Sequence, residues 1–448
     1  MMKFFEWTAF FALMINTFAW SETITIFVSC KTLGRLEQCG CSTNIEGGLE
    51  ARAGFLERAR KEAPDAILAD LGGFMPLLRE KKKPEFLLPN EDSVNAAVGQ
   101  TNLEGMKLLQ YDVILCAPSD LDYDSAVLTS AFPSKDVFLC SDVESNGSWL
   151  SPYKIIQRKD IKIGFVGASS LVEKKGRINR EFTILPAGES IPPIVKRLRQ
   201  NEHVDAVVLL AHEPPPTVQR WLSNYKGPRI DLVIALDFGI RVEQAGDVYL
   251  TNAPGKGRAL GKIVLDIQKG QGIQDVQYQR IPMYPSKYSN KTMRNFLYRS
   301  YAGMVDALQL NADPLEIHNN QENGYLGAKI CMGCHKEEYE QWMKTRHASA
   351  FFELLEQTRH WVPECVRCHV TGFGHPEGFR QFPQSDHLMH VQCETCHGPG
   401  QRHVDEFGMG HIKLTPQKSL CVQCHTSKFS PQFDSMFDLY YKQTFHQE

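Results

Sequence analysis

The chain has 448 residues, of which 42% are hydrophobic and 23% charged, and its formal net charge is -3. This length exceeds what one hydrophobic core usually fills, so we expect more than one domain. The near-neutral charge excludes the basic surface of a nucleic-acid-binding protein and gives no general attraction to an anionic membrane. Beyond the amino terminus, no apolar segment is long enough to cross a membrane.

Residues 1–21 have the pattern of a secretory signal peptide. Lys3 supplies a positive charge, residues 7–18 are apolar, and Ala19 and Ser21 are small residues before a cleavage site at Glu22. The apolar run is too short to span a bilayer stably. An acidic residue and the single basic residue near the start depart from the pattern, so an uncleaved membrane anchor is the alternative. We expect a periplasmic or otherwise extracytoplasmic protein.

Residues 22–285 alternate apolar runs of strand length with helical patterns, which predicts a layered α/β domain with buried strands. The predicted strands are residues 24–28, 66–71, 112–116, 161–166, 206–210 and 232–236.

The order of segments in this domain resembles the metallophosphoesterase domain of the 5′-nucleotidase family. The resemblance rests on residues 24–37, 47–52, 68–74, 111–123, 208–212 and 231–239. It implies an α/β layered sandwich, metallophosphoesterase-like, with two metal ions. The positions that correspond to the family's metal ligands are Lys31, Leu33, Gly73, Pro118, Ser119, Asp237, Gly239 and His212, of which only His212 retains the residue that the family uses. Two-metal catalysis needs several anionic or imidazole ligands, so we expect the domain to be catalytically inactive.

Five cysteines lie outside the motifs described below, at Cys30, Cys39, Cys41, Cys116 and Cys140. Their odd number leaves at least one without an intrachain partner. Disulfides or small buried residues are the ordinary interpretations. The alternative hypothesis is a thiolate metal or redox site on the phosphoesterase-like scaffold, made by Cys30, Cys39, Cys41, Cys116 and His212.

Residues 286–324 are predicted to be a helix and a linker. Apolar residues with helical spacing between residues 290 and 310 indicate a docking helix. The polar stretch 319–324 is typical of an interdomain linker.

Four copies of the pattern CxxCH occupy residues 325–448. The cysteines are Cys331, Cys334, Cys365, Cys368, Cys393, Cys396, Cys421 and Cys424, and the histidines are His335, His369, His397 and His425. Two thiols one helical turn apart can attach to the two vinyl groups of a haem while the adjoining imidazole binds the iron, so each pattern indicates one covalent haem c. Zinc sites also use paired cysteines but do not need a histidine after each second cysteine. Haem attachment outside the cytoplasm agrees with the predicted export.

Thirteen of the 15 histidines lie between His318 and His446. The 124 residues from 325 to 448 are too few for an ordinary core around four haems. We therefore expect a small, mainly α-helical multihaem cytochrome c domain in which the haems serve as the core.

Residues 391–403, 340–351 and 430–446 resemble the cytochrome c554 and c-prime family of tetrahaem cytochromes. The resemblance implies that the CxxCH histidines are the proximal iron ligands and that His347, His403 and His446 are distal ligands. With three distal ligands for four haems, the resemblance also implies that the second haem, on His369, is five-coordinate. The remaining histidines are interpreted as surface or hydrogen-bonding residues: His318, His360, His375, His387, His390 and His411.

The leading hypothesis is an extracytoplasmic tetrahaem electron carrier that exchanges electrons with a redox partner protein, with the phosphoesterase-like domain for docking or ligand binding. The alternative is a multihaem oxidoreductase that acts on a small nitrogen or sulfur species at the five-coordinate haem. A third hypothesis is a sensor whose degenerate domain binds a ligand and tunes the haems.

Overall fold

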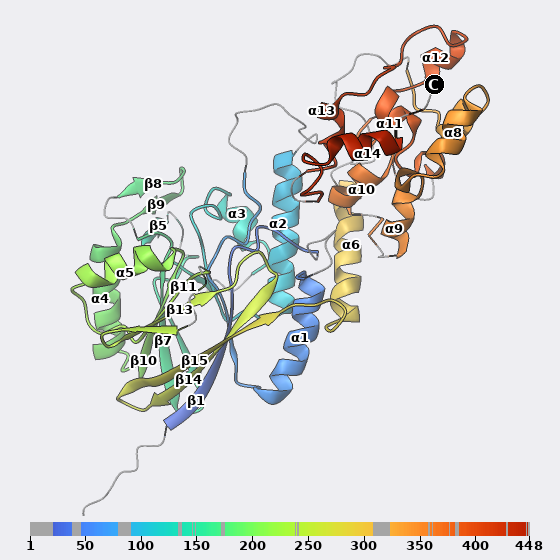
Figure 1. The fold of residues 1–448 in the computed structure, drawn as a ribbon. Helices are drawn as coiled ribbons and strands as arrows, with labels where there is room; N and C mark the ends of the chain where they lie inside the picture. Colours follow the sequence, from blue (N-terminus) through green and yellow to red (C-terminus); the bar gives the residue numbers. More distant parts are fainter. Residues whose placement is uncertain are drawn as a thin grey trace, which may run out of the picture.

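The computed structural model contains an α/β part followed by a smaller helical region, which we define as residues 323–446 (Figure 1). The described residues are 21–37, 46–78, 91–132, 137–145, 147, 149–171, 175–237, 239, 242–307, 323–356, 359–360, 362–375, 377–380, 385–426, 429–444 and 446. The predicted signal peptide up to residue 20, Cys39, Cys41 and linker residues 308–322 lie outside them. Among the described residues no helix is both long and apolar enough to cross a membrane.

Two six-stranded sheets form the centre of the α/β part. The first has the order β15-β14-β1-β2-β3-β4 and the second the order β12-β13-β11-β10-β7-β6. The strands of the first sheet are β1 (Ser21–Ser29), β2 (Ile67–Asp70), β3 (Val113–Leu115), β4 (Phe138–Leu139), β14 (Ala259–Gln268) and β15 (Gly272–Pro282). Those of the second are β6 (Lys154–Arg158), β7 (Ile161–Ala168), β10 (Ala206–Ala211), β11 (Leu232–Leu236), β12 (Val242–Ala245) and β13 (Val248–Ala253).

A small third sheet has the order β5-β9-β8, with β5 (Val143–Ser145), β8 (Gly176–Arg177) and β9 (Phe182–Ile184). The predicted strands are all present, and the predicted fold class is confirmed.

The two large sheets pack face to face because their central strands are apolar on both faces. In β10, Ala206, Val208 and Leu210 join the core between the sheets, whereas Val207 and Leu209 join a second core on the outer face. This division follows the alternation of side chains along a strand. It explains why the sequence of β10 is continuously apolar rather than alternating.

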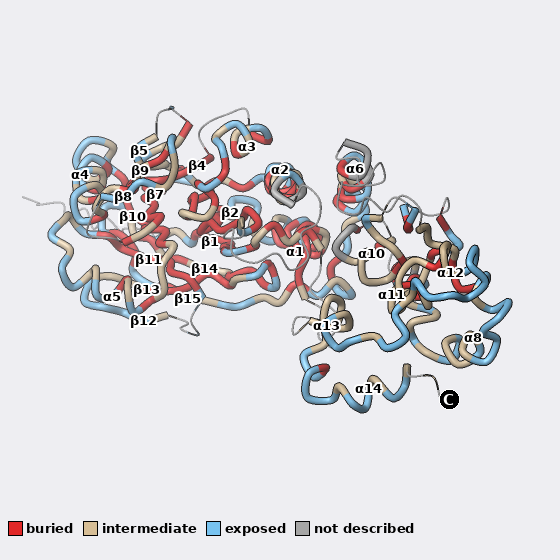
Figure 2. Tube along the Cα trace, turned by 90° about the horizontal axis from the view of Figure 1, so that it is seen from above, coloured by how far each residue is buried: buried red, intermediate tan, exposed pale blue. Residues whose placement is uncertain are grey.

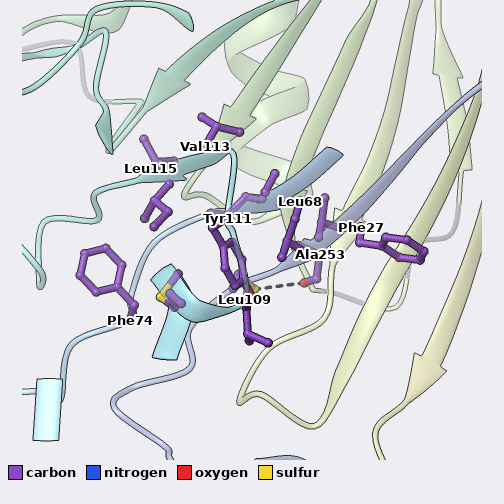
Figure 3. Close-up of a cluster of buried hydrophobic side chains, with 14 of the residues drawn as sticks. Phe27, Leu68, Phe74, Leu109, Tyr111, Val113, Leu115 and Ala253 are labelled. Carbon is purple, nitrogen blue, oxygen red and sulfur yellow. Dashed lines mark hydrogen bonds between the residues drawn. The ribbon is translucent and has the colours of Figure 1, made fainter. Parts of the chain in front are cut away.

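Helices cover the outer faces of both sheets (Figure 1). On the outer face of the second sheet lie α4 (Ala187–Gln200) and α5 (Pro215–Asn224), and on the first sheet lie α1 (Leu49–Glu62), α2 (Glu91–Leu108) and α6 (Lys291–Ala307), with the short α3 (Ser125–Thr129) nearby. The buried residues Phe27, Leu68, Tyr111 and Leu115 pack together in the core of the first sheet (Figure 3).

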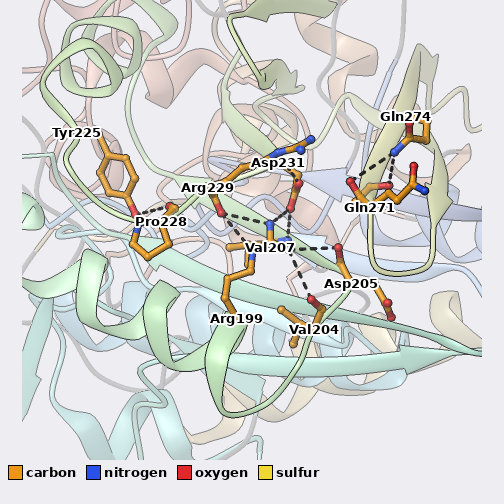
Figure 4. Close-up of polar contacts among 11 residues, drawn as sticks. Arg199, Val204, Asp205, Val207, Tyr225, Pro228, Arg229, Asp231, Gln271 and Gln274 are labelled. Atoms are coloured by element: carbon orange, nitrogen blue, oxygen red, sulfur yellow. Dashed lines mark hydrogen bonds and ion pairs between the residues drawn. The ribbon is translucent and has the colours of Figure 1, made fainter.

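Polar contacts fix the loops at the amino-terminal ends of β10 and β11 (Figure 4). The buried carboxylate of Asp231 accepts hydrogen bonds from the Arg199 guanidinium and, at 2.6 Å, from the backbone N–H of Val207. The Arg199 side chain also donates to the carbonyl oxygen of Asp205 at 3.2 Å. We assign this cluster a structural role, because its contacts hold the loops at this end of the sheet together.

The helical region is built from short helices around a small apolar core. Its elements are α7 (Ala328–Cys331), α8 (Lys336–Trp342), a 3-10 turn (Arg346–Ser349), α9 (Ala350–Glu356), α10 (Pro363–His369), a 3-10 turn (Asp386–Leu388), α11 (Cys393–His397), α12 (Gln401–Asp405), α13 (Lys418–Cys421) and α14 (Phe437–Thr444). The buried members of its apolar core are Phe351, Leu354, Val366, Val370, Phe379 and Leu388.

The two parts meet at α6 and α10. Met293, Leu297 and Tyr301 lie four residues apart on α6 and are buried in the core of the α/β part. Val362, just before α10, is buried in the same core, and the partly buried Cys365 packs against it. A haem-attachment motif therefore lies directly against the α/β part, and most of the helical region extends away from it (Figure 2).

Candidate functional sites

All four CxxCH motifs lie on, or directly after, short helices. Helix α10 contains the whole motif from Cys365 to His369, and α11 spans Cys393–His397. Helices α7 and α13 end at the first cysteine of their motifs. A helical turn places cysteines three positions apart on the same face, which is the arrangement that two thioether bonds to one haem require.

Six histidine rings form three pairs across the helical region. The ring centroids are 6.2 Å apart for His335 and His403, 6.0 Å for His347 and His425, and 6.1 Å for His397 and His446. The angles between the ring planes are 25°, 58° and 16° in the same order. Each pair joins one CxxCH histidine to one histidine that the sequence resemblance designates as a distal ligand.

The fourth motif histidine, His369, has a different environment. Its Nδ1 donates a hydrogen bond to the carbonyl oxygen of Ala350 at 2.5 Å. Within the described ranges, no histidine ring is paired with that of His369 at the spacing of the other three pairs. The four motifs are therefore not equivalent.

Several of the paired histidines have an acceptor for the second ring nitrogen. The contacts of Nδ1 are His397 to the Lys413 carbonyl at 2.5 Å, His403 to the Gly410 carbonyl at 2.9 Å, His425 to the Ser430 hydroxyl at 3.1 Å and His446 to the Gln341 amide oxygen at 3.4 Å. A carbonyl oxygen only accepts, so Nδ1 of His397 and His403 carries the proton and Nε2 is available to a metal.

The two residues next to Cys393 connect the third motif to the first. The buried Glu394 carboxylate accepts hydrogen bonds from the backbone N–H groups of Leu326, Gly327 and Gly400, at 2.7–3.1 Å. The side-chain oxygen of Gln392 accepts from the N–H of Ala328 at 2.5 Å. Neither Glu394 nor Gln392 was predicted from the sequence, and their position beside a CxxCH cysteine is the one signal that could have identified them.

The motifs also contact one another through their cysteines. The side chains of Cys331 and Cys393 lie close enough to interact, as do those of Cys368 and Cys424. Cys396 lies close enough to Cys421 for electrostatic interaction. The attachment points are therefore neighbours in the order first, third, fourth, second.

Polar atoms without a protein partner lie buried near the second and fourth motifs. They include an NH2 group of the Arg359 guanidinium, Nε of Arg367 and the hydroxyl of Thr426. Buried donors of this kind normally have an acceptor. Cationic donors beside the CxxCH motifs fit the carboxylates of haem propionates.

The α/β part contains a cavity of about 450 Å³ at the carboxyl ends of its strands. Its lining includes six of the positions that correspond to phosphoesterase metal ligands: Lys31, Leu33, Gly73, Pro118, Ser119 and His212. Ligands of α/β proteins usually bind at this edge of the sheet. The structure therefore brings these positions together, but with side chains that are mostly unable to bind a metal.

His212 is held as a neutral imidazole at this cavity. Its Nδ1 lies 2.6 Å from the carbonyl oxygen of Leu71, and burial lowers its pKa to about 4. In the part of the chain that the structure describes, no three metal-ligating side chains converge.

Two buried aspartates hold the loops around the cavity and were not predicted from the sequence. The Asp120 carboxylate accepts from the backbone N–H groups of Gly73, Met75 and Ala117, and Asp142 accepts from those of Ser169 and Ser170. Burial raises the pKa of Asp120 to about 7 and that of Asp142 to about 6.

The described cysteines of the α/β part are buried thiols. The thiol of Cys30 donates to the carbonyl oxygen of Ala253 at 3.1 Å (Figure 3), and burial raises its pKa. Cys116 and Cys140 lie in side-chain contact, and burial raises the pKa of Cys116. The hypothesis of a thiolate site stays a prediction because Cys39 and Cys41 lie outside the described residues.

Part of the helical region is similar to known cytochromes. Residues 330–398 match the family described as cytochrome c554 and c-prime. Cytochrome c-554 of Nitrosomonas europaea is 34% identical over an alignment of 134 residues, which covers 22% of this chain and 57% of that protein. The chain therefore spans less than two thirds of this relative's length.

Solved structures resemble the α/β part. A 5′-nucleotidase precursor from Thermus thermophilus has a TM-score of 0.54 and 14% identity, covering 64% of this chain and 60% of that one. The sulfate thiohydrolase SoxB of Thermus thermophilus has a TM-score of 0.51 and 16% identity, covering 63% and 61%. At these identities the likeness establishes the fold alone. The chain thus joins a metallophosphoesterase-like α/β fold to a helical region that is similar to the cytochrome c554 and c-prime family over residues 330–398.

Proposed function

We propose that the protein is an extracytoplasmic tetrahaem electron carrier whose α/β part is a non-catalytic scaffold. Covalently bound haem c is the cofactor that the cytochrome c554 family implies. We assign one haem to each CxxCH motif and hence four to the chain. The relative in the same family and the predicted signal peptide both support export.

The three histidine pairs carry this proposal. A metal–imidazole bond is about 2 Å long, so two imidazoles on opposite sides of one metal have ring centroids about 6 Å apart. The separations of 6.0–6.2 Å match this distance. We therefore assign the CxxCH members as proximal ligands and His347, His403 and His446 as distal ligands.

Electron transfer is the chemistry that a haem held between two of these histidines would supply, and bis-histidine ligation would lower its reduction potential. The chain's own residues fix the imidazoles through Nδ1 contacts and hold the motifs together through Glu394 and Gln392. Because the attachment cysteines of different motifs are in contact, electrons can pass between neighbouring haems without leaving the protein.

Two observations support the scaffold role of the α/β part: the lining of its cavity and its junction with the helical region. The cavity has the phosphoesterase location, but Lys31, Gly73 and Ser119 occupy positions where metal ligands would be needed. The junction places the second motif against the main core through Val362 and Cys365. We infer that the α/β part supports the haem on His369 rather than hydrolysing phosphate esters.

Spectroscopy of the purified, haem-loaded protein tests the proposal. We expect four haems per chain by pyridine haemochrome assay and mass spectrometry, with three low-spin bis-histidine signals in the EPR spectrum. His403→Ala and His446→Ala should each convert one low-spin haem into a high-spin one, whereas His411→Ala should convert none. A spectrum unchanged in the first two variants would contradict the ligand assignment.

The environment of His369 favours a second candidate function, a multihaem oxidoreductase acting on a small nitrogen or sulfur species. No described histidine pairs with this ring, which favours an open coordination position on its haem. Nitric oxide binding to one haem in four, together with turnover of nitrite, hydroxylamine or sulfite under reducing conditions, would support this function. Nitric oxide binding without turnover would leave electron transfer as the function.

A further inference from the structure

Residues 404–414, which we call the 404–414 segment, carry three strongly exposed apolar side chains. The exposed fractions are 97% for Phe407, 73% for Met409 and 84% for Leu414. Single exposed apolar residues are ordinary, whereas a contiguous group indicates an interaction site. The segment begins with the last two residues of α12, which lies at the end of the helical region remote from the α/β part (Figures 1 and 2).

The backbone of this segment is fixed in an unfavourable conformation. Phe407 and His411 have φ values of 55° and 67°, and Gly408 and Gly410 have 89° and 72°. Left-handed backbone is disfavoured for a bulky residue such as phenylalanine and persists only where the surroundings impose it. The Glu406 carboxylate lies 2.7 Å from His411 Nε2 and 3.7 Å from the Arg402 guanidinium, which ties the two ends of the turn together.

The same segment lies behind ligands of two proposed haems. The carbonyl oxygens of Gly410 and Lys413 accept hydrogen bonds from Nδ1 of His403 and His397. With Nδ1 bound to the segment, each ring has its Nε2 on the other side for the iron. The segment therefore lies on the Nδ1 side of both imidazoles, away from the nitrogen that would bind iron, and its three apolar side chains are exposed.

We propose that the 404–414 segment is the docking surface for a soluble redox partner protein that presents an apolar patch around its own cofactor. This inference rests on the proposed electron-transfer function. The reaction is a single electron transfer: a ferrous haem iron of this chain becomes ferric as the partner's metal is reduced, and no bond is formed or broken. Two ligand imidazoles and their carbonyl partners separate the docking surface from two haems.

Charge and size favour this partner over other occupants. The Glu406 charge is compensated by Arg402, and the exposed Asp405 and Lys413 have opposite signs. The surface therefore gives no net attraction to an anionic membrane. A stable dimer usually buries about 800 Å² on each partner, which this single short segment is too small to provide, whereas electron-transfer encounters use smaller interfaces.

Stopped-flow kinetics of the intact haem-loaded protein test the inference. The reduced protein is mixed either with an oxidised blue-copper protein whose copper lies beneath an apolar patch, or with ferricyanide, which needs no docking surface. The variant Phe407→Ser/Met409→Ser/Leu414→Ser should react about tenfold more slowly with the copper protein, corresponding to a loss of about 1.4 kcal/mol of encounter free energy. Its rate with ferricyanide should equal that of the wild type.

A matched control removes exposed apolar side chains elsewhere in the helical region. Met343→Ser/Leu439→Ser changes residues that are also more than half exposed and should leave both rates unchanged. An unchanged rate of the triple variant with the copper protein would overturn the inference, as would an equal slowing with ferricyanide, which would place these side chains in haem packing. Loss of self-association or of vesicle binding in the triple variant would assign the surface to a second copy or to lipid instead. If even the wild type reduces neither oxidant, the electron-transfer function itself fails.

Discussion

The α/β part and the helical region contrast in what holds each together. In the α/β part, two sheets and their helices enclose an extensive apolar core, while the cavity at the strand ends lacks the ligands of the fold that it resembles. Among the described residues of the helical region, six buried residues form the apolar core, while six histidines are arranged in three pairs. Apolar packing therefore holds the α/β part together, whereas the helical region combines a small apolar core with paired histidines.

Preventing haem attachment should unfold one part of the protein and leave the other folded. In protein produced without haem maturation, we expect the α/β part to remain folded and the helical region to unfold, because a core of six residues cannot offset the conformational entropy of about 120 ordered residues. Limited proteolysis followed by mass spectrometry should yield a resistant fragment ending near α6 and digest the four motifs.

The haem-loaded protein is the control, and both parts should resist proteolysis in it. Equal resistance of the helical region with and without haem would show that its apolar core suffices, and the contrast between the two parts would then fail.

The sequence predicted those strands whose burial requires apolar residues. The buried strands β1, β2, β3, β7, β10 and β11 have continuous apolar runs because both faces are covered. The hairpin of β14 and β15 was missed, although Ala259–Gln268 alternates buried and half-buried residues with the period of two that marks a half-buried strand. The sequence prediction uses continuous apolar runs, which an alternating strand lacks.

For the candidate site, the sequence likewise predicted the residues that side-chain chemistry identifies and none of those that only the fold brings together. The histidines are recognisable because side-chain chemistry defines them. Their acceptors at Gly410 and Lys413 are backbone carbonyls, which every residue carries, so no residue pattern could identify them. Glu394 satisfies several N–H groups from distant segments, and only the folded chain shows that they converge.

Glu394→Gln should produce the largest effect of a single substitution away from the iron. The amide keeps one acceptor oxygen and turns the other into a donor, which leaves a buried N–H of Gly327 or Gly400 facing another donor. We expect the helical region to lose about 2–4 kcal/mol of stability, measured by denaturant unfolding followed at the haem Soret band.

The exposed Glu337 on α8 provides the matched control. Glu337→Gln should change stability by no more than about 0.5 kcal/mol. A loss of the same size in both variants would mean that net charge, rather than the Glu394 hydrogen bonds, is responsible.

Asp142→Asn tests whether the stability that Asp142 gives to the loops around the cavity of the α/β part depends on pH. Burial raises the pKa of Asp142 to about 6, so the folded state binds its proton more tightly than the unfolded state. Its stability contribution is therefore full below the unfolded pKa of about 4 and is lost as pH rises through about 6. Relative to the asparagine variant, the wild type should lose about 2 kcal/mol between pH 4 and pH 7.

Urea unfolding of both proteins at pH 4, 5.5 and 7 measures this difference, since the pH dependence of all other groups cancels. A difference that stays constant or grows with pH would show that the two backbone N–H groups bound to Asp142 outweigh its burial.

Ser430→Ala should have the smallest effect and is confined to one haem. The Ser430 hydroxyl is the acceptor for Nδ1 of His425, and losing it makes the imidazole a weaker donor to ferric iron. A hydrogen bond worth about 1 kcal/mol corresponds to a rise in reduction potential of about 40 mV for one electron. The affected haem can be recognised because the planes of His347 and His425 are 58° apart, whereas those of the other pairs are within 25°.

Strongly inclined imidazole planes give a low-spin EPR signal at larger g than nearly parallel planes, so an EPR-monitored redox titration can follow this haem separately. Only the large-g signal should move in Ser430→Ala. Ser435→Ala, which removes an exposed hydroxyl bound to the Gln432 carbonyl, should move none. If the signals of the nearly parallel pairs shift instead, the pairing of His347 with His425 is wrong. A shift of every signal together would mean that the haems are so strongly coupled that no single contact changes the potential of one of them alone. The helical region would then act as one redox unit.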